Sequence, residues 1–252
     1  MKKVLPIILC LGFVFPLVML SWAQSPPEAT VLFFKGNEFY KQGQYTEAIE
    51  AYEEILQKGW ASGPLYYNMG NSYFKKGALG QAILNYTRAK EISPRDADIK
   101  ANLDYVSSLM NKNFSVRSGV WQHLEDDFMD FYTLDEMSVI ILTLFFLIVC
   151  VHLISLYQQW PVFRCRVCLF LLLLGLIVFV YGLGLKWDKE QREAIMIATT
   201  VAKYEPLDNS TIYFEIPQGL SVKIIKEEKG WVKIEREDGK LGWVKRETVE
   251  KI

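Results

Sequence analysis

The stretch FFKGNEFYKQG at residues 33–43 returns as YYNMGNSYFKKG at residues 66–77. An offset of 34 residues superimposes Gly36 on Gly70, Asn37 on Asn71, Phe39 on Tyr73, Tyr40 on Phe74, Gly43 on Gly77, Ala48 on Ala82 and Tyr52 on Tyr86. A period of this length with small residues at fixed positions is typical of a solenoid built from helix–turn–helix units. Gly36, Gly70, Ala48 and Ala82 let the two helices of a repeat approach closely, and the aromatic residues fill the space between helices. Gly43 and Gly77 supply the turn between the two helices. The sequence therefore predicts two helical repeats.

The two repeats span residues 29–62 and 63–96, and they resemble the tetratricopeptide repeat family. The resemblance includes Pro94 near the end of the second copy, where the first copy has Trp60. A partial third unit at residues 97–116 begins in register, but Asp104 stands where the glycine is expected. Because each repeat buries its apolar face against a neighbour, we expect this partial unit to cap the other two.

By resemblance to this family, the first helix of each repeat lines a concave groove that binds a partner. The groove residues are Phe33, Asn37, Tyr40, Lys41, Tyr67, Asn71, Phe74 and Lys75. Side-chain amides bind the backbone of an extended peptide, and aromatic rings form pockets for its apolar side chains. Helix packing and capping are the alternative use of these positions. A carboxylate clamp needs basic residues where Phe33 and Ala101 stand, so recognition of a free C-terminus is not expected.

The N-terminus and two later segments are strongly apolar. Residues 1–23 carry Lys2 and Lys3, then an apolar stretch, then the small residues of a cleavage site, an order typical of a secretory signal peptide. An uncleaved anchor is the alternative, and either form exports the residues that follow. The runs 138–157 and 167–185 contain no Asp, Glu, Lys or Arg and are long enough to cross a bilayer as helices. We therefore predict a transmembrane helical hairpin.

Charges on the two sides of the hairpin predict its orientation. The short loop 158–166 carries Arg164 and Arg166 and no acid. Acidic residues precede the first run at Glu125, Asp126, Asp127, Asp130, Asp135 and Glu136. Because basic residues stay on the cytoplasmic side, the loop is predicted to be cytoplasmic. Residues 24–137 and 186–252 are then extracytoplasmic. Within them we expect an amphipathic connector at 117–137 and a charged helical stalk at 186–194.

Strand-like alternation begins at Ile195, and glycine-containing turns separate its segments. This pattern predicts a small antiparallel barrel over residues 195–252. The segments Gly230-Trp231-Val232, Asp238-Gly239 and Gly242-Trp243-Val244 resemble the bacterial SH3-type domain. A candidate site for a peptide or a cell-wall fragment consists of Tyr204, Trp231 and Trp243. Packing in the barrel core is the alternative role of the two tryptophans.

Composition excludes several classes of function. The chain has 28 Lys and Arg against 29 Asp and Glu, and no basic tract interleaved with aromatic residues, so nucleic acid is not an expected partner. The four cysteines lie in or beside apolar runs and form no disulfide framework. The chain has only two histidines, His123 and His152, and no nucleophile or phosphate-binding motif. We therefore expect no enzyme, no cofactor and no metal site.

The order of these segments resembles the BatE family of the Bacteroides aerotolerance operon. That resemblance implies von Willebrand A-type Bat proteins and a MoxR-type ATPase system as partners, with a role in aerotolerance or envelope stress. The predicted fold class is a multidomain membrane protein with an all-α repeat domain, a transmembrane hairpin and a small all-β SH3-like barrel. The predicted function is a membrane-anchored scaffold for protein–protein interaction. A cell-wall sensor that binds peptidoglycan through its SH3-like domain is the alternative.

Overall fold

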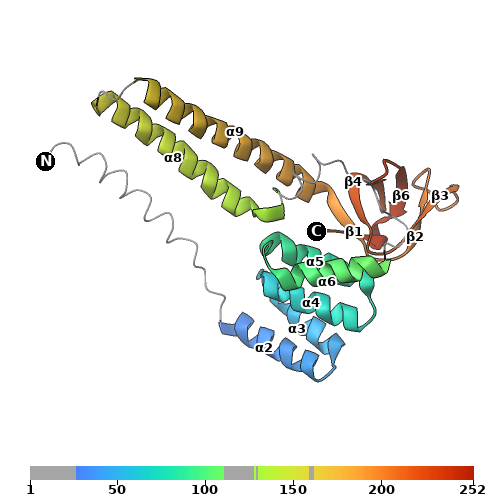
Figure 1. Cartoon of the computed structure of the whole chain (residues 1–252). Helices are drawn as coiled ribbons and strands as arrows, with labels where there is room; N and C mark the ends of the chain where they lie inside the picture. The colour runs from blue at the N-terminus through green and yellow to red at the C-terminus, as the bar shows by residue number, and fades with distance from the viewer. Residues whose placement is uncertain (1–26, 111–127, 129, 159–161) are drawn as a thin grey trace.

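The computed structural model describes residues 27–110, 128, 130–158 and 162–252. The predicted signal peptide lies outside the described residues, as do the end of the partial repeat, most of the connector and part of the loop between the apolar runs. Figure 1 shows three parts in chain order: a group of short helices, a pair of long helices and a sheet. This architecture confirms the predicted fold class.

Five short helices form the repeat domain. They are α2 (Pro27–Lys41), α3 (Tyr45–Gln57), α4 (Gly63–Lys75), α5 (Leu79–Ile92) and α6 (Ala97–Met110). Gly43 and Gly77 follow α2 and α4 with φ angles of 78° and 77°, a left-handed conformation in which glycine ends a helix without steric cost. At the start of α4, the Ser62 side chain accepts a hydrogen bond from the backbone N–H of Leu65. Local sequence therefore places the ends of these helices.

A tyrosine from the second helix of each repeat packs against a glycine of the first helix. Tyr52 is 0% exposed and Tyr86 is 1% exposed. A Cβ atom added to Gly70 would lie 2.7 Å from the Tyr86 ring, and one added to Gly36 would overlap the Tyr52 ring. The repeated glycine therefore makes room for the tyrosine ring.

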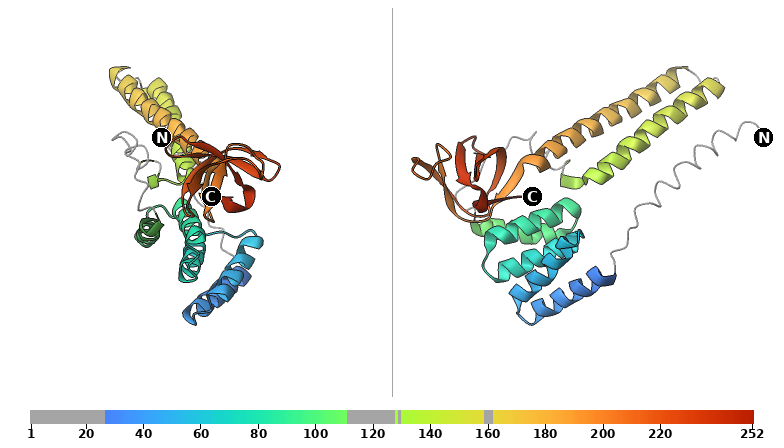
Figure 2. Two further views of the ribbon diagram at one scale, coloured as in Figure 1. Left: turned by 90° about the vertical axis from the view of Figure 1, so that its right-hand side faces the viewer. Right: turned by 180° about the vertical axis from the view of Figure 1, so that it is seen from behind.

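The long helices are α8 (Leu134–Gln158) and α9 (Val162–Arg192). They lie side by side and extend away from the other two parts (Figures 1 and 2). Among the described residues, both helices are long and apolar enough to cross a membrane. The mean hydropathy is 2.9 in Leu134–Leu156 and 2.7 in Cys165–Arg192. Their apolar side chains are largely exposed, Leu156 and Phe170 among them. Such a surface is stable in lipid, so the hairpin indicates membrane association.

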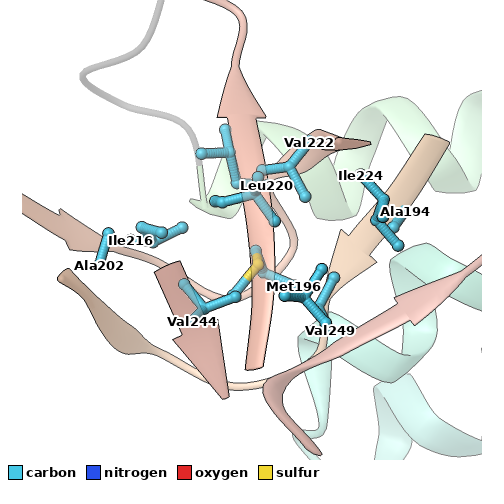
Figure 3. Packing of buried hydrophobic residues seen from close by; sticks show 11 residues of the cluster. Ala194, Met196, Ala202, Ile216, Leu220, Val222, Ile224, Val244 and Val249 are labelled. Atoms are coloured by element: carbon cyan, nitrogen blue, oxygen red, sulfur yellow. The ribbon is translucent and has the colours of Figure 1, made fainter. Parts of the chain in front are cut away.

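The C-terminal part is a seven-stranded antiparallel sheet with the strand order β3-β2-β6-β5-β4-β1-β7. The strands are β1 (Glu193–Met196), β2 (Thr200–Lys203), β3 (Ile212–Ile216), β4 (Ser221–Glu228), β5 (Trp231–Arg236), β6 (Leu241–Lys245) and β7 (Val249–Lys251). Alternate side chains meet in one core, shown in Figure 3, where Met196, Ile216 and Val244 are fully buried. Gly230 and Gly239 have φ angles of 82° and 80° in the turns between strands. We call this part the barrel.

Helix α9 continues directly into the barrel, because it ends at Arg192 and β1 begins at Glu193. Residues 186–194, expected to be a stalk that leads to a separate unit, are therefore the end of α9 and the first residues of β1. Lys186 in this segment is 3% exposed, and its Nζ lies 3.0 Å from a carboxylate oxygen of Glu91 on α5. The segment therefore packs against the repeats as well as joining the hairpin to the barrel.

Helix α5 also contacts the barrel. Ile83 packs in one apolar cluster with Ile195 of β1 and with Ile252. The Arg88 guanidinium donates hydrogen bonds to Glu250 at 2.9 Å and to the Lys251 carbonyl at 2.6 Å. These contacts combine buried apolar surface with charge-assisted hydrogen bonds. The barrel therefore covers the α5 face of the repeat domain.

A second set of contacts joins the repeats to the base of the hairpin. Lys90 Nζ lies 2.6 Å from Asp130, which precedes α8, and Arg95 pairs with Glu136 at the start of α8. Both cations come from α5 or the turn that follows it. The repeat domain and the barrel consequently lie at the same end of the hairpin, as Figure 2 shows from two further sides.

Candidate partner-binding sites

Asn37 on α2 connects the two helices of the first repeat. Its Oδ1 accepts a hydrogen bond of 2.7 Å from the Tyr52 hydroxyl on α3. The same oxygen accepts a second bond of 2.8 Å from Nδ2 of Asn68 on α4. One amide oxygen therefore joins the second helix of its own repeat to the first helix of the next repeat.

Asn71 repeats this arrangement one unit later. Its Oδ1 accepts a hydrogen bond of 2.7 Å from the Tyr86 hydroxyl and one of 3.1 Å from Nδ2 of Asn102 on α6. Asn102 also donates to the Tyr67 hydroxyl at 3.1 Å. The polar contacts therefore form a regular row across α2, α4 and α6. We call this row the asparagine ladder, made of Asn37, Asn68, Asn71 and Asn102.

The amide nitrogens of Asn37 and Asn71 point to a binding role beyond packing. Within the part of the chain that the structure describes, neither Nδ2 has a hydrogen-bond partner. Neither atom is among the fully buried polar atoms without a partner, and both residues are half-buried. Each amide is fixed through its oxygen and keeps two N–H donors for a ligand. This geometry suits the carbonyl oxygens of an extended peptide.

The predicted aromatic residues of the groove are half-buried. Phe33 lies 6.1 Å from the Tyr52 ring, and Tyr67 lies 5.9 Å from the Tyr86 ring, measured between ring centroids. All four predicted rings pack against the repeat core: Phe33, Tyr40, Tyr67 and Phe74. One side of each ring therefore stabilises the fold, and the exposed remainder is available to a ligand.

Lys41 and Lys75 end α2 and α4 and are exposed. A cation in the last turn of a helix is stabilised by the partial negative charge of the free carbonyl groups. Neither lysine is in an ion pair among the described residues. The two ammonium groups can therefore attract a carboxylate of a partner.

The sequence patterns gave no role to Asn68, Asn102 or Tyr105, which complete this surface. Tyr105 on α6 is 56% exposed, and its ring centroid lies 5.9 Å from that of Phe74. Asn68 and Asn102 are themselves separated by the repeat period of 34 residues. Extending the self-comparison into the partial third unit would have found this pair.

Burial controls the ionisation of the tyrosines beneath the groove. Desolvation raises the pKa of Tyr52 to about 12, with a smaller contribution from Tyr40. Burial also raises the pKa of Tyr40, again reinforced by neighbouring tyrosines. The phenols therefore remain neutral at physiological pH. The Tyr52 hydroxyl can then donate the hydrogen bond that holds Asn37.

The barrel has a second exposed aromatic surface. The rings of Tyr204 and Tyr213 stack at 4.4 Å between centroids, and they are 58% and 40% exposed. Trp231 is half-buried, with the Nζ atoms of Lys203 and Lys245 at 5.6 Å and 6.0 Å from its ring. Aromatic faces beside ammonium groups suit a ligand with apolar surface and negative charge.

Trp243 does not belong to this surface. It is 9% exposed on β6, and its backbone pairs with Lys203 of β2 and Lys233 of β5. An inner strand position with so little exposed area makes Trp243 a packing residue. Of the two roles considered for Trp243, its burial favours packing in the barrel core.

A charged cavity of about 640 Å³ separates the end of α9 from β4 and β5. Several of its charges already have partners within the protein. Arg192 lies 2.8 Å from Asp188, and Glu193 accepts a hydrogen bond of 2.7 Å from Ser221. Among the described residues, no group of three or more His, Cys, Asp or Glu side chains is arranged to hold a metal ion.

Comparison with known families identifies both soluble modules. Residues 29–58 and 63–96 match models of the tetratricopeptide repeat, and residues 205–250 match the model of the bacterial SH3 domain. These matches confirm the two resemblances at the level of the modules. The SH3 match begins after β1 and β2, so the first two strands of the barrel lie outside the matched residues.

A similar protein is the peptidyl-prolyl cis-trans isomerase CYP7 of Saccharomyces cerevisiae. The two sequences are 42% identical over 48 residues, which is 19% of this chain and 12% of the yeast protein. This chain therefore spans only a small part of that relative's length. The likeness is local.

Proposed function

We propose that this protein is a membrane-anchored scaffold that holds another protein in the groove across α2, α4 and α6. The observation that carries the proposal is the fixed orientation of the Asn37 and Asn71 amides, each held by its oxygen, with no partner for its N–H donors among the described residues. Exposed aromatic edges and two lysines border these donors. Tetratricopeptide repeats and a bacterial SH3 domain favour protein–protein interaction.

We place the protein in a bacterial inner membrane as a multi-pass protein, with both modules extracytoplasmic. The two apolar helices support membrane association, and the bacterial SH3 domain supports an envelope location. Arg164 and Arg166, in the first turns of α9, favour a cytoplasmic location for the end of the hairpin where α8 and α9 meet. The contacts of α5 with both the barrel and the base of the hairpin are consistent with this arrangement.

The partners we propose follow from the resemblance to the BatE family. They are von Willebrand A-type membrane proteins and a MoxR-type ATPase system, acting in aerotolerance or envelope stress. The scaffold needs no catalytic residues, and we propose that the protein is not an enzyme. Deletion of its gene should then reduce recovery of those partners as one complex.

A paired substitution tests the role of the groove. In Asn37→Asp with Asn71→Asp, the side chains keep an acceptor oxygen for Tyr52 and Tyr86 but lose the N–H donors. We expect partner recovery with the full-length membrane protein to fall about tenfold, the effect of losing roughly 1.4 kcal/mol. The control is Asn209→Asp, which adds a charge at an exposed position of the barrel. Unchanged recovery by the double variant would overturn the groove assignment.

The alternative function is a cell-wall sensor, and the exposed stack of Tyr204 and Tyr213 favours it. Such a surface beside Trp231 and two lysines could hold a peptidoglycan fragment. Co-sedimentation of the solubilised full chain with purified peptidoglycan tests this function. Binding that is lost in Tyr204→Ala and retained in Asn37→Asp with Asn71→Asp would support it, and absence of binding would exclude it.

A further inference from the structure

The first repeat contains an apolar pocket of about 260 Å³ at one edge of the groove. Its walls come from the first turns of α2, the end of α3 and the start of α4. They include Phe33, Phe34, Ile55, Trp60, Pro64 and Leu65. Among the residues that the structure describes, no Asp, Glu, Lys or Arg lines this pocket. We call it the first-repeat pocket.

Two walls of the pocket are unusually exposed for large apolar residues. Phe34 is 65% exposed and Trp60 is 36% exposed. The rings of Phe33 and Phe34 pack edge to face, with centroids 6.2 Å apart at an interplanar angle of 67°. Nearby, Lys58 Nζ lies 2.5 Å from Glu28 and links the end of α3 to the first turn of α2. The pocket therefore keeps its shape while its apolar surface faces solvent.

The second repeat provides an internal comparison for this pocket. An offset of 34 residues carries the first-repeat residues Phe34, Trp60, Ala61, Ser62 and Pro64 onto Asn68, Pro94, Arg95, Asp96 and Asp98. Both repeats have the same helical packing, so packing alone does not require apolar residues at these positions. At Phe34, Ala61 and Pro64 the apolar character is specific to the first repeat, where these residues line a cavity. Exposed apolar side chains at positions where the other repeat is polar are a feature of binding surfaces.

The volume and chemistry of the pocket define what it can hold. A cavity of about 260 Å³ is smaller than the 300–1,000 Å³ typical of sites for drug-sized ligands, and it is concave where a membrane-inserting surface would protrude. The Ser62 hydroxyl already accepts the N–H of Leu65 at 3.3 Å. A neutral lining matches an uncharged occupant.

We propose that the first-repeat pocket binds one large apolar side chain of the partner segment that occupies the groove. This inference rests on the proposed function, because it gives that segment an anchor residue. Phe33 belongs both to the pocket and to the predicted groove, so the anchor lies next to the donors of Asn37, one helical turn along α2. The partner is then an extended segment with a leucine-like or aromatic side chain at this position.

The pocket can be tested without the partner. The full chain, labelled with 5-fluorotryptophan and held in a lipid nanodisc, is titrated with blocked amino acids while ¹⁹F NMR follows Trp60. The probes are N-acetyl-leucine amide, N-acetyl-tryptophan amide and N-acetyl-lysine amide, and Trp60→Phe assigns the resonance. We expect saturable shifts with the first two probes and binding about tenfold weaker with the lysine probe.

Two variants on one helix give the matched comparison. Phe34→Asn introduces the residue that stands at this position in the second repeat. It should weaken binding of the two apolar probes at least about fivefold. Val31→Asn changes a side chain that is also 65% exposed but lies outside the pocket, and it should leave the shifts unchanged. Equal losses in both variants would contradict the proposal.

Other outcomes separate this proposal from its alternatives. Absence of a saturable shift, or an equal response to leucine and lysine probes, would overturn the pocket assignment. Broadening of the Trp60 resonance by a lipid spin-labelled in its headgroup would assign the surface to the membrane instead. The proposed function is tested separately by partner recovery with the Asn37→Asp and Asn71→Asp pair, so each idea can fail alone.

Discussion

The Tyr52 hydroxyl donates a hydrogen bond of 2.7 Å to Oδ1 of Asn37, fifteen positions earlier in the chain. Tyr86 and Asn71 make the same bond at the same distance one repeat later. Because this contact recurs with the sequence period, it is a structural feature of each repeat. It links a buried tyrosine ring to an amide in the proposed groove, so packing of the repeat core fixes the orientation of that amide.

Substitution of Gly70 by alanine should destabilise the repeat domain. The added methyl group would lie 2.7 Å from the buried ring of Tyr86, and overpacking of this kind costs about 1–3 kcal/mol. Gly184→Ala is the control, since its methyl group would meet nothing within 4 Å. Thermal unfolding of the full chain, followed by far-ultraviolet circular dichroism, measures the difference. Equal melting temperatures of the two variants would contradict close packing of Tyr86 against Gly70.

Loss of the tyrosine hydroxyl should have a smaller effect than the glycine substitution. Tyr86→Phe removes one neutral hydrogen bond, while Asn71 keeps its bond from Asn102 at 3.1 Å. We expect a loss of about 1 kcal/mol in the free energy of unfolding. Denaturant titration of the full chain measures it. A loss above that of Gly70→Ala would show that the hydroxyl contributes more than this single bond.

The stability of the repeats should fall in alkaline solution. Burial raises the pKa of Tyr52 to about 12, whereas a tyrosine in the unfolded chain titrates near its usual pKa of about 10. Below that value both states hold the proton and stability is unaffected. Between about 10 and 12 only the unfolded chain releases it, so folding weakens as pH rises. Ultraviolet absorbance should detect tyrosinate over the same pH range in which circular dichroism detects unfolding. Tyr52→Phe should reduce the dependence of stability on pH.

Arg88 should hold the barrel on the repeat domain. Arg88→Ala removes the bonds to Glu250 and to the Lys251 carbonyl, and charge-assisted bonds of this kind contribute about 1.5–3 kcal/mol each. Hydrogen exchange should accelerate in β7 and on α5. The control is Arg192→Ala, whose pair with Asp188 is more than half exposed and should contribute little. Equal exchange in both variants would show that Arg88 does not secure the contact.

Lys186 should secure the hairpin to the repeats. It is 3% exposed, and its Nζ lies 3.0 Å from Glu91 and 3.7 Å from Glu190. Lys186→Met leaves two carboxylates without their cation, a change that costs about 3–5 kcal/mol. Adding Glu91→Gln and Glu190→Gln should recover most of that loss. Limited proteolysis between α5 and α9 measures the docking, and a triple variant as weak as Lys186→Met would refute the charge argument.

Local patterns in the sequence predicted much of the fold. The 34-residue offset identified both repeats, and Gly43 and Gly77 marked the turns, because helix periodicity and helix ends depend on neighbouring residues. The sequence left two roles open for Trp243 for a related reason. Alternation shows that a residue lies on a strand, but the packing of the whole sheet decides which side is covered.

Contacts between distant segments could not be predicted in the same way. Arg88 and Glu250 are 162 positions apart, and no periodic pattern joins them. Asn37 and Asn68 are 31 positions apart, so their bond crosses between repeats and does not follow the period of 34. The first-repeat pocket was similarly hidden, because Trp60 stood out in the sequence only as a departure from the repeat pattern.

Photo-cross-linking in intact cells tests the central claim most directly. A photoreactive amino acid replaces Lys75 in the groove, and in a matched strain it replaces Glu50, which is exposed on α3. The scaffold proposal predicts a discrete adduct with another protein from position 75, its loss in the Asn37→Asp and Asn71→Asp background, and no such adduct from position 50. Equal cross-linking from both positions, or an adduct from position 75 that the asparagine substitutions leave unchanged, would contradict the proposal.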